Sequence, residues 1–168
     1  DTVATLLAGK SRSFGKEYDT YIGFILGTGT NTCYSESNSN ILKKPELDRG
    51  GSQIINIESG SFKKVVRTDI DVEYDNTTVN PGDYAIEKMT SGGYIGGLSL
   101  TALKRAADEG VFSPATASAI KALSDLSTEE VDKYLSAEGS HKGRLGDSIN
   151  DTNDILSVTQ ILEAIIER

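Results

Sequence analysis

The feature that most constrains this chain is a glycine-rich break between two strand-like runs. Residues 21–26 (YIGFIL) and 32–35 (TCYS) have strand-forming side chains, and the sequence Gly-Thr-Gly-Thr-Asn separates them at residues 27–31. This pattern predicts two paired strands joined by a tight turn, because glycine tolerates the positive φ angles that hairpin turns need. The backbone N–H groups and the threonine hydroxyls of the same turn could also cradle an anion. The residues alone leave both interpretations open, a plain turn and a phosphate-binding loop.

Around this hairpin the sequence predicts several helices and one further strand. Residues 2–8 have helical composition, and residues 53–58 form a short apolar strand that ends at a Ser-Gly break. One long helix is expected from about Pro81 to Gly110, since proline is tolerated in a first helical turn and glycine suits a helix end. Residues 63–79 and 138–150 are expected to be irregular. Three further helices are expected at residues 114–124, 127–136 and 161–166.

Four glycines stand inside the predicted long helix. Each costs a helix interior about 1 kcal/mol relative to alanine. Glycines retained at that cost indicate close packing of the helix against another backbone, or against a ligand. These residues are Gly92, Gly93, Gly96 and Gly97.

The charge balance restricts the class of partner. The 168 residues, which suit one ordinary domain, include 25 acidic and 17 basic side chains, for a formal net charge of −8. This excess argues against nucleic acid or an anionic membrane surface, both of which need a basic face, but a local helix N-terminus could still bind a phosphorylated ligand. The apolar runs are shorter than a membrane span and no leader sequence is visible, so we expect a cytoplasmic protein. The single cysteine, Cys33, is expected to be buried rather than nucleophilic.

Three acidic residues stand at positions that either local structure or a ligand could explain. Asp1 precedes the first helix, where aspartate is a good N-cap. Glu58 ends the strand at residues 53–58, and ligands gather at such strand ends in open α/β sheets. Glu87 lies in the first turns of the predicted Pro81 helix, where the helix dipole favours an acid. Taken singly, each residue is better explained by local structure.

Four short motifs, in their order along the chain, resemble those of the hexokinase family. Residues 1–6 are similar to the family's catalytic N-D-T segment and its apolar helix, with the asparagine lacking. Residues 27–34 are similar to its second phosphate loop, G-T-G-x-N-A-x-Y. The other matches are residues 55–62 with I-N-x-E-aromatic-G-x-F, and residues 80–82 and 87–92 with N-P-G and E-K-M-x-S-G. One such motif would be unspecific, but the ordered set is specific.

The resemblance implies a ribonuclease-H-like α/β fold of the actin type, the large lobe of a hexokinase, present in part. Residues 1–168 are then expected to be a fragment of that lobe, and the match extends from Asp1 to about Phe112 and more loosely to the terminal helix. The family's small lobe, its first phosphate loop and its adenosine-binding segment have no counterpart here. A chain of this kind would hold sugar and ATP on one side only, so we expect it to have little kinase activity alone.

The resemblance also implies a reaction and a role for each candidate residue. The reaction is ATP-dependent phosphorylation of a hexose such as glucose at its 6-hydroxyl, feeding glycolysis. Asp1 is implied as the general base, and Mg²⁺ would arrive with ATP rather than in a protein cage. The implied hexose-binding residues are Asn31, Glu58 and Glu87, and the implied ATP-phosphate-binding residues are Gly27, Thr28 and Gly29.

Two departures from the family pattern concern the sugar specificity. Ser59 stands where an aromatic residue is usual, and Tyr84 stands where many members carry a glutamine near the sugar. These departures leave the preferred hexose open, and the oligomeric state is open as well. An alternative of another class is a sugar-sensing or regulatory module that binds hexose without phosphorylating it. A third candidate, another sugar or acetate kinase of the same superfamily, fits the N-x-E and E-K-M-x-S-G pair less well.

Overall fold

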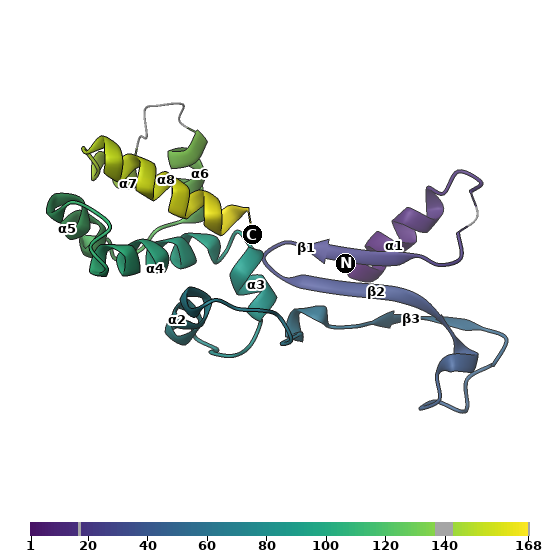
Figure 1. Cartoon of the computed structure of the whole chain (residues 1–168). Coiled ribbons are helices and arrows are strands. Elements are labelled where there is room, and N and C mark those ends of the chain that lie inside the picture. Colours follow the sequence, from purple (N-terminus) through teal and green to yellow (C-terminus); the bar gives the residue numbers. More distant parts are fainter. Residues whose placement is uncertain (17, 137–142, 168) are drawn as a thin grey trace. The chain divides into compact units, whose positions relative to one another are not determined.

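A computed structural model describes residues 1–16, 18–136 and 143–167 of the chain. The chain divides into two compact units, Asp1–Phe62 and Lys63–Arg168. The first unit is built on a small β-sheet and the second is built from helices (Figure 1). Each unit is described by itself.

The first unit contains a three-stranded antiparallel sheet in the order β1-β2-β3. The register sets Leu26 opposite Thr30, and it sets Cys33 opposite both Gly23 and Asn56. The predicted hairpin is therefore confirmed, and the predicted third strand is present but ends before Glu58. The elements are α1 (Thr2–Ser11), β1 (Ile22–Leu26), β2 (Thr30–Ser37), η1 (Asn38–Asn40), β3 (Ser52–Asn56) and η2 (Ser59–Ser61).

Helix α1 packs closely on one face of this sheet because Gly23 has no side chain. A Cβ atom at Gly23 would lie 2.7 Å from the carbonyl oxygen of Thr2 and 3.0 Å from the Cβ atom of Leu6. Leu6 and Cys33 fill the space between helix and sheet, and both are buried. The predicted burial of Cys33 is confirmed, and its role is to pack.

The second unit contains seven helices in its described residues. Helix α4 packs against α2, α3, α5, α6 and α8, so it forms the centre of the unit (Figure 1). The core is aliphatic apart from Phe112 and Tyr134; its most deeply buried members are Leu103, Ile120, Val131, Tyr134, Leu145, Val158 and Leu162. The helices are α2 (Asp69–Thr77), α3 (Ala85–Thr90), α4 (Ile95–Asp108), α5 (Pro114–Ala122), α6 (Thr128–Ser136), α7 (Arg144–Asp147) and α8 (Thr152–Ile166).

The prediction of one long helix from Pro81 to Gly110 is wrong, because two helices occupy this segment. Helix α3 ends where Ser91 turns to extended backbone (φ −90°, ψ 147°), and α4 begins after the two glycines that follow. Helix α3 also begins later than predicted. Tyr84 has a left-handed backbone with φ 55°, so Pro81 lies in a turn ahead of the helix.

The predicted close approach to another backbone is confirmed for Gly96 in α4, whereas Gly97 makes room for a side chain. A Cβ atom on Gly96 would collide with the backbone of residues 126–128, and one on Gly97 would lie 2.7 Å from the ring of Tyr74. Thr128 completes this junction, since its hydroxyl donates to the carbonyl of Gly92 (2.5 Å) and accepts the N–H of Gly96 (3.0 Å). The first turn of α4 is thus capped by the start of α6.

Two further helices lie where irregular structure was predicted. Helix α2 has few apolar side chains, so its periodicity is weak, but a capping box between Thr68 and Asp71 starts it. Helix α7 is a single turn held by Arg144, whose guanidinium group binds Asp125 and Glu130. Across the residues that the structure describes, we find no helix with the length and apolar character needed to span a membrane.

Candidate functional site

Asp1 lies at the start of α1 and caps it. Its carboxylate oxygen Oδ1 accepts the N–H of Thr2 at 2.7 Å, and its carbonyl oxygen accepts the N–H of Thr5 at 2.9 Å. The predicted N-cap is therefore confirmed. Asp1 is exposed, whereas Thr2 is buried against the sheet, so the cap holds the carboxylate at the rim of the first unit.

The residues predicted to bind phosphate form the loop of the β1–β2 hairpin. The N–H of Gly27 donates to the carbonyl of Gly29 at 3.1 Å, which closes the loop. Gly27, Thr28 and Gly29 are all exposed, and Thr30 at the base of the loop is buried. This geometry confirms the turn and leaves its residues accessible to a ligand.

Asn31 and Glu58 are brought together through a third side chain, that of Asn56. The amide nitrogen Nδ2 of Asn31 donates to Oδ1 of Asn56 at 2.9 Å, and Nδ2 of Asn56 donates to the carboxylate of Glu58. All three side chains lie at the ends of β2 and β3. We call Asn31, Asn56 and Glu58 the amide relay.

The orientation of Asn31 in this relay is fixed by the backbone. Its oxygen Oδ1 accepts the N–H of Thr32 at 2.8 Å and the N–H of Ser59 at 3.3 Å. Because Oδ1 is engaged by two donors, Nδ2 must face Asn56. The site residues of β2 and of the chain after β3 are thereby held in one hydrogen-bonded arrangement.

Glu58 adopts a left-handed backbone conformation that residues other than glycine rarely adopt. Its φ and ψ angles are 56° and 50°, and such a conformation costs about 1 kcal/mol or more. The following 3-10 turn compensates, since the N–H and the hydroxyl of Ser61 both donate to the carbonyl of Glu58 at 3.1 and 2.8 Å. This turn takes the chain out of β3 and brings the Glu58 carboxylate back to Asn56.

Asp1 and the amide relay lie on the same face of the sheet. Cys33 donates its thiol hydrogen to the carbonyl of Thr2 (3.4 Å), so it faces the start of α1. Asn56 stands opposite Cys33 in the antiparallel register, and Asn31 precedes Cys33 by two residues on β2. Opposed residues, and residues two apart on one strand, point to the same face of a sheet. The first unit therefore gathers the candidate base and two amides on the α1 side.

Glu87, the third predicted hexose-binding residue, belongs to the second unit. It lies in the first turn of α3 and is half-buried, and its carbonyl accepts the N–H of Ser91 at 2.8 Å. Its neighbour Lys88 is buried and donates to Oδ1 of Asp75 (2.5 Å) and to the carbonyl of Asn80 (2.6 Å).

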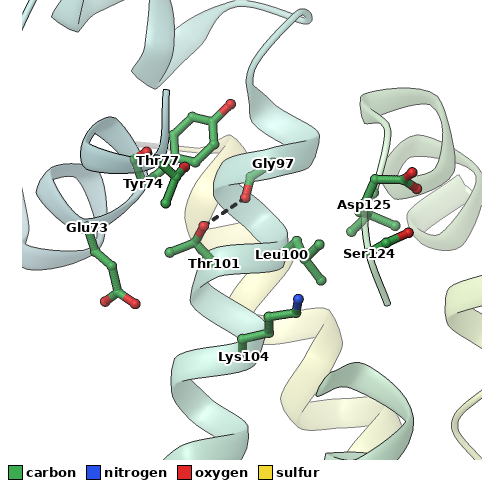
Figure 2. A pocket seen from close by; sticks show the side chains of 10 residues that line it. Glu73, Tyr74, Thr77, Gly97, Leu100, Thr101, Lys104, Ser124 and Asp125 are labelled. Atoms are coloured by element: carbon green, nitrogen blue, oxygen red, sulfur yellow. Dashed lines mark hydrogen bonds between the residues drawn. The ribbon is translucent and has the colours of Figure 1, made fainter. Parts of the chain in front are cut away.

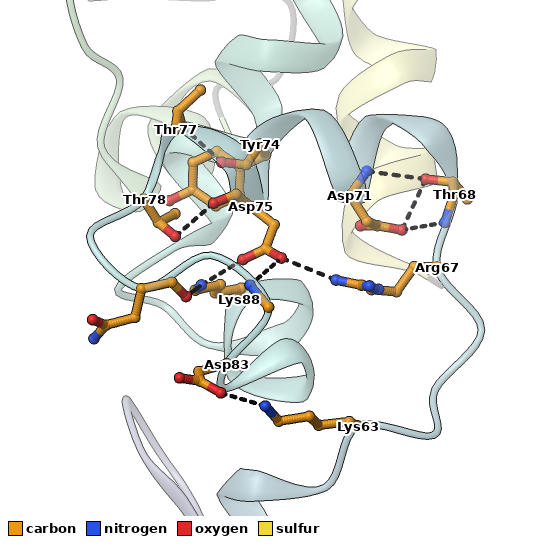
Figure 3. A network of polar contacts seen from close by, with 12 residues as sticks. Lys63, Arg67, Thr68, Asp71, Tyr74, Asp75, Thr77, Thr78, Asp83 and Lys88 are labelled. Carbon is orange, nitrogen blue, oxygen red and sulfur yellow. Dashed lines mark hydrogen bonds and ion pairs between the residues drawn. The ribbon is translucent and has the colours of Figure 1, made fainter.

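Asp75 is the centre of a polar network that holds the Asn-Pro-Gly segment against α2 and α3 (Figure 3). It also accepts the N–H of Gly82 (2.8 Å) and pairs with Arg67 (3.0 Å). Burial alone would raise the pKa of Asp75, but the hydrogen bonds from Lys88 and Gly82 and the charges of Lys88 and Arg67 outweigh it, so the pKa lies below its usual value. The network anchors the helix that carries Glu87. The sequence signal for this network is the E-K-M motif, which contains Lys88. From the sequence alone, Lys88 was assigned no function.

A cavity of about 420 Å³ lies in the second unit between α2, α4 and the segment before α6 (Figure 2). Tyr74, Gly97 and Leu100 line it, with Glu73, Lys104 and Asp125 at its edges. None of the residues predicted from the sequence to bind sugar or phosphate lines this cavity.

Across the described ranges there is no cluster of three or more His, Cys, Asp or Glu side chains suited to a cation.

Comparisons with known proteins identify the family. The sequence profile described as hexokinase matches residues 21–168. Hexokinase-1 of Nicotiana tabacum is 34% identical over 159 residues, which are 92% of this chain and 31% of the relative. Hexokinase-like 1 protein of Arabidopsis thaliana is 47% identical over 79 residues, which are 46% of this chain and 16% of the relative. A solved hexokinase from Schistosoma mansoni, complexed with glucose, superposes with a TM-score of 0.75 at 23% identity, covering 98% of this chain and 39% of that one.

The chain therefore belongs to the hexokinase family. The predicted fold class, the α/β architecture of a hexokinase present in part, is confirmed by the structural match. The chain spans about a third of the length of the tobacco relative.

Proposed function

We propose that this chain forms the part of an ATP-dependent hexose kinase that holds the sugar and the transferred phosphoryl group. The observation that carries the proposal is the common face of the first unit, on which the capped carboxylate of Asp1 lies with the amide relay. A carboxylate beside a set of fixed amide and carboxylate groups suits a substrate with many hydroxyls, one of which must lose a proton.

Hexose binding is assigned to Asn31 and Glu58 of the first unit, and the family resemblance implies the same role for Glu87. Glu58 accepts from Asn56 and can accept further hydrogen bonds from sugar hydroxyls, and Asn31 can donate its second amide hydrogen. The solved Schistosoma relative was complexed with glucose, which supports glucose as the first hexose to test. The product, a 6-phosphorylated hexose, would enter glycolysis. We therefore propose that the complete enzyme acts in the cytoplasm, at the start of that pathway.

Phosphoryl transfer is assigned to Asp1 and the hairpin loop. The carboxylate of Asp1 takes the proton of the 6-hydroxyl as that oxygen forms its bond to the γ-phosphorus of ATP. The bond from the γ-phosphorus to ADP breaks in the same in-line step. Backbone N–H groups and the hydroxyl of the loop of Gly27, Thr28 and Gly29 would bind the phosphate oxygens. Mg²⁺ carried with ATP would neutralise part of the phosphate charge.

A binding-only function remains the second candidate. One oxygen of Asp1 already accepts the N–H of Thr2, so the residue has a structural use that needs no catalysis. A sugar sensor built on the same unit would keep the amide relay and would phosphorylate nothing.

The experiment is a coupled assay of hexose-dependent ADP formation by the complete protein that carries this chain. We expect activity with glucose, and we expect Glu58→Gln to raise the KM for hexose about 10-fold or more, because a hydrogen bond to a charged group is lost, with the KM for ATP unchanged. Glu46→Gln is the matched control, since Glu46 is exposed and pairs with exposed Lys44 at 3.5 Å. Glucose binding without ADP formation would favour the sensor. The 168-residue chain alone is expected to form no ADP at enzyme-like rates.

A further inference from the structure

Asn56 stands between the two sugar-site side chains of the first unit and contacts both. It accepts a hydrogen bond from Asn31 (2.9 Å) and donates one to Glu58. We infer that Asn56 is a positioning residue of the sugar site, one that sets which atoms of Asn31 and Glu58 face the hexose. The inference rests on the proposed function.

The donor direction along the relay is determined from one end. Two backbone N–H groups, those of Thr32 and Ser59, engage Oδ1 of Asn31, so only Nδ2 of Asn31 can face Asn56. Oδ1 of Asn56 must then be the acceptor, which leaves its Nδ2 as the donor to Glu58. Glu58 is therefore held as an acceptor, the state in which a carboxylate can bind sugar hydroxyls.

The position of Asn56 requires an asparagine. It is the last residue of β3, opposite buried Cys33, and its side chain spans from β2 to the turn that contains Glu58. Alanine could make neither bond. Ionised aspartate has the same size and could accept from Asn31, but it has no hydrogen to donate to Glu58. Asn56→Asp thus breaks one link of the relay and keeps the other.

Because Asn56→Asp introduces a titratable group, its effect on glucose binding should depend on pH. In Asn56→Asp the new carboxylate lies at hydrogen-bond distance from that of Glu58. Two like charges this close raise the pKa at which the pair takes up its first proton. At high pH they repel and Glu58 is displaced. As the pH falls, one proton is shared between them and the hydrogen bond is restored. The titratable groups nearest position 56 on this face are Asp1, the N-cap of α1, and Cys33 on β2. The elements packed against β3 also carry Lys10 on α1 and Tyr34 and Glu36 on β2, and all of these groups are present in every variant compared.

The test measures glucose affinity by calorimetry and the KM values for glucose and ATP by coupled assay, from pH 5.5 to pH 8, in the complete protein. We expect Asn56→Asp to weaken glucose binding about 10-fold or more at pH 8 and to recover toward wild type at pH 5.5. Asn56→Ala should bind glucose weakly at every pH, and the KM for ATP should be unchanged in both variants. Asn76→Asp, the same change of amide to acid at an exposed position of α2, should behave as wild type.

The outcomes separate this inference from the proposed function. Normal glucose affinity of Asn56→Asp at pH 8, in a protein that phosphorylates glucose, would overturn the role of Asn56 and leave the function intact. A defect that does not recover at pH 5.5, with the circular dichroism spectrum of the folded protein retained, would also overturn it, since a merely structural role predicts equal defects at all pH. A wild-type protein that neither binds nor phosphorylates glucose would overturn both.

Discussion

The hydroxyl of Thr32 lies 3.0 Å from the hydroxyl of Ser59, so the two side chains share a hydrogen bond between β2 and the turn after β3. Both residues differ from the hexokinase motifs, which have alanine and an aromatic residue at these positions. The same turn supplies the Ser59 N–H that orients Asn31. The two departures are thus coupled in space, and the pair fastens the turn that carries Glu58.

We therefore expect Thr32→Val and Ser59→Ala to be non-additive. A double-mutant cycle on the free energy of unfolding should give a coupling of about 0.5–1.5 kcal/mol, since both hydroxyls are half-buried and each loses its partner in the single variants. The control pair is Ser37 and Ser39, whose exposed hydroxyls lie 2.8 Å apart and whose coupling should be smaller. Additive effects of Thr32→Val and Ser59→Ala would show that the bond contributes nothing.

Gly23→Ala should displace α1 and with it Asp1. The new methyl group would overlap the carbonyl of Thr2 and the side chain of Leu6, and overpacking of this kind destabilises by about 1–3 kcal/mol. We expect a lower kcat as well as a lower melting temperature, because the capped carboxylate moves with the helix.

The control for this change is Gly9→Ala on the same helix. Beyond its chain neighbours and the backbone of its own helix, a Cβ built on Gly9 meets no atom of the described chain within 4 Å, so this variant should be more stable than wild type by about 0.5–1 kcal/mol, with kcat unchanged. A Gly23→Ala protein as stable and active as Gly9→Ala would refute the close packing of α1.

How far the sequence predicted this structure depended on how local each signal was. The hairpin, the buried Cys33 and the cap at Asp1 follow from neighbouring residues, and each was predicted. The amide relay could not be predicted, because Asn31 and Asn56 are 25 residues apart and meet only through the β2–β3 register. The left-handed backbone of Glu58 carries no signal in the residue type, since it is held by hydrogen bonds from Ser61.

In the helical unit, too, the prediction failed where the structure depends on contacts between distant residues. The break between α3 and α4 was missed because their apolar positions read as one continuous pattern, although Gly92 and Gly93 mark the interruption. Helix α2 was missed because it has few apolar side chains, and because its buried Asp75 is stabilised by Lys88 and Arg67 from outside the helix. Pairing of that kind is a tertiary contact, and no local propensity reports it.

The ion pair of Glu130 and Arg144 should make the second unit sensitive to acid. Hydrogen bonds from the Arg144 guanidinium, and then from the N–H of Ser127, lower the pKa of Glu130 from 4.5 to about 2. A carboxyl whose pKa is lower in the folded state stabilises the protein fully above its unfolded pKa, and this contribution is lost as the pH falls from about 4.5 to about 2.

Arg144→Met should therefore lower the free energy of unfolding at pH 6 and flatten its dependence on pH between 5 and 2, as measured by urea unfolding. Lys133→Met removes the same charge from an exposed pair with Glu129 and should change little at either pH. An equally steep acid dependence in Arg144→Met and wild type would contradict the role given to this pair.

The most direct test of the central claim, that Asp1 is the base of a hexose kinase, is Asp1→Asn in the complete protein. Asparagine caps a helix about as well as aspartate, so α1 and the melting temperature should be preserved while the proton acceptor is removed. We expect kcat for glucose phosphorylation to fall by about 10²- to 10⁴-fold, with glucose affinity unchanged. A variant that retains wild-type kcat would contradict the central claim.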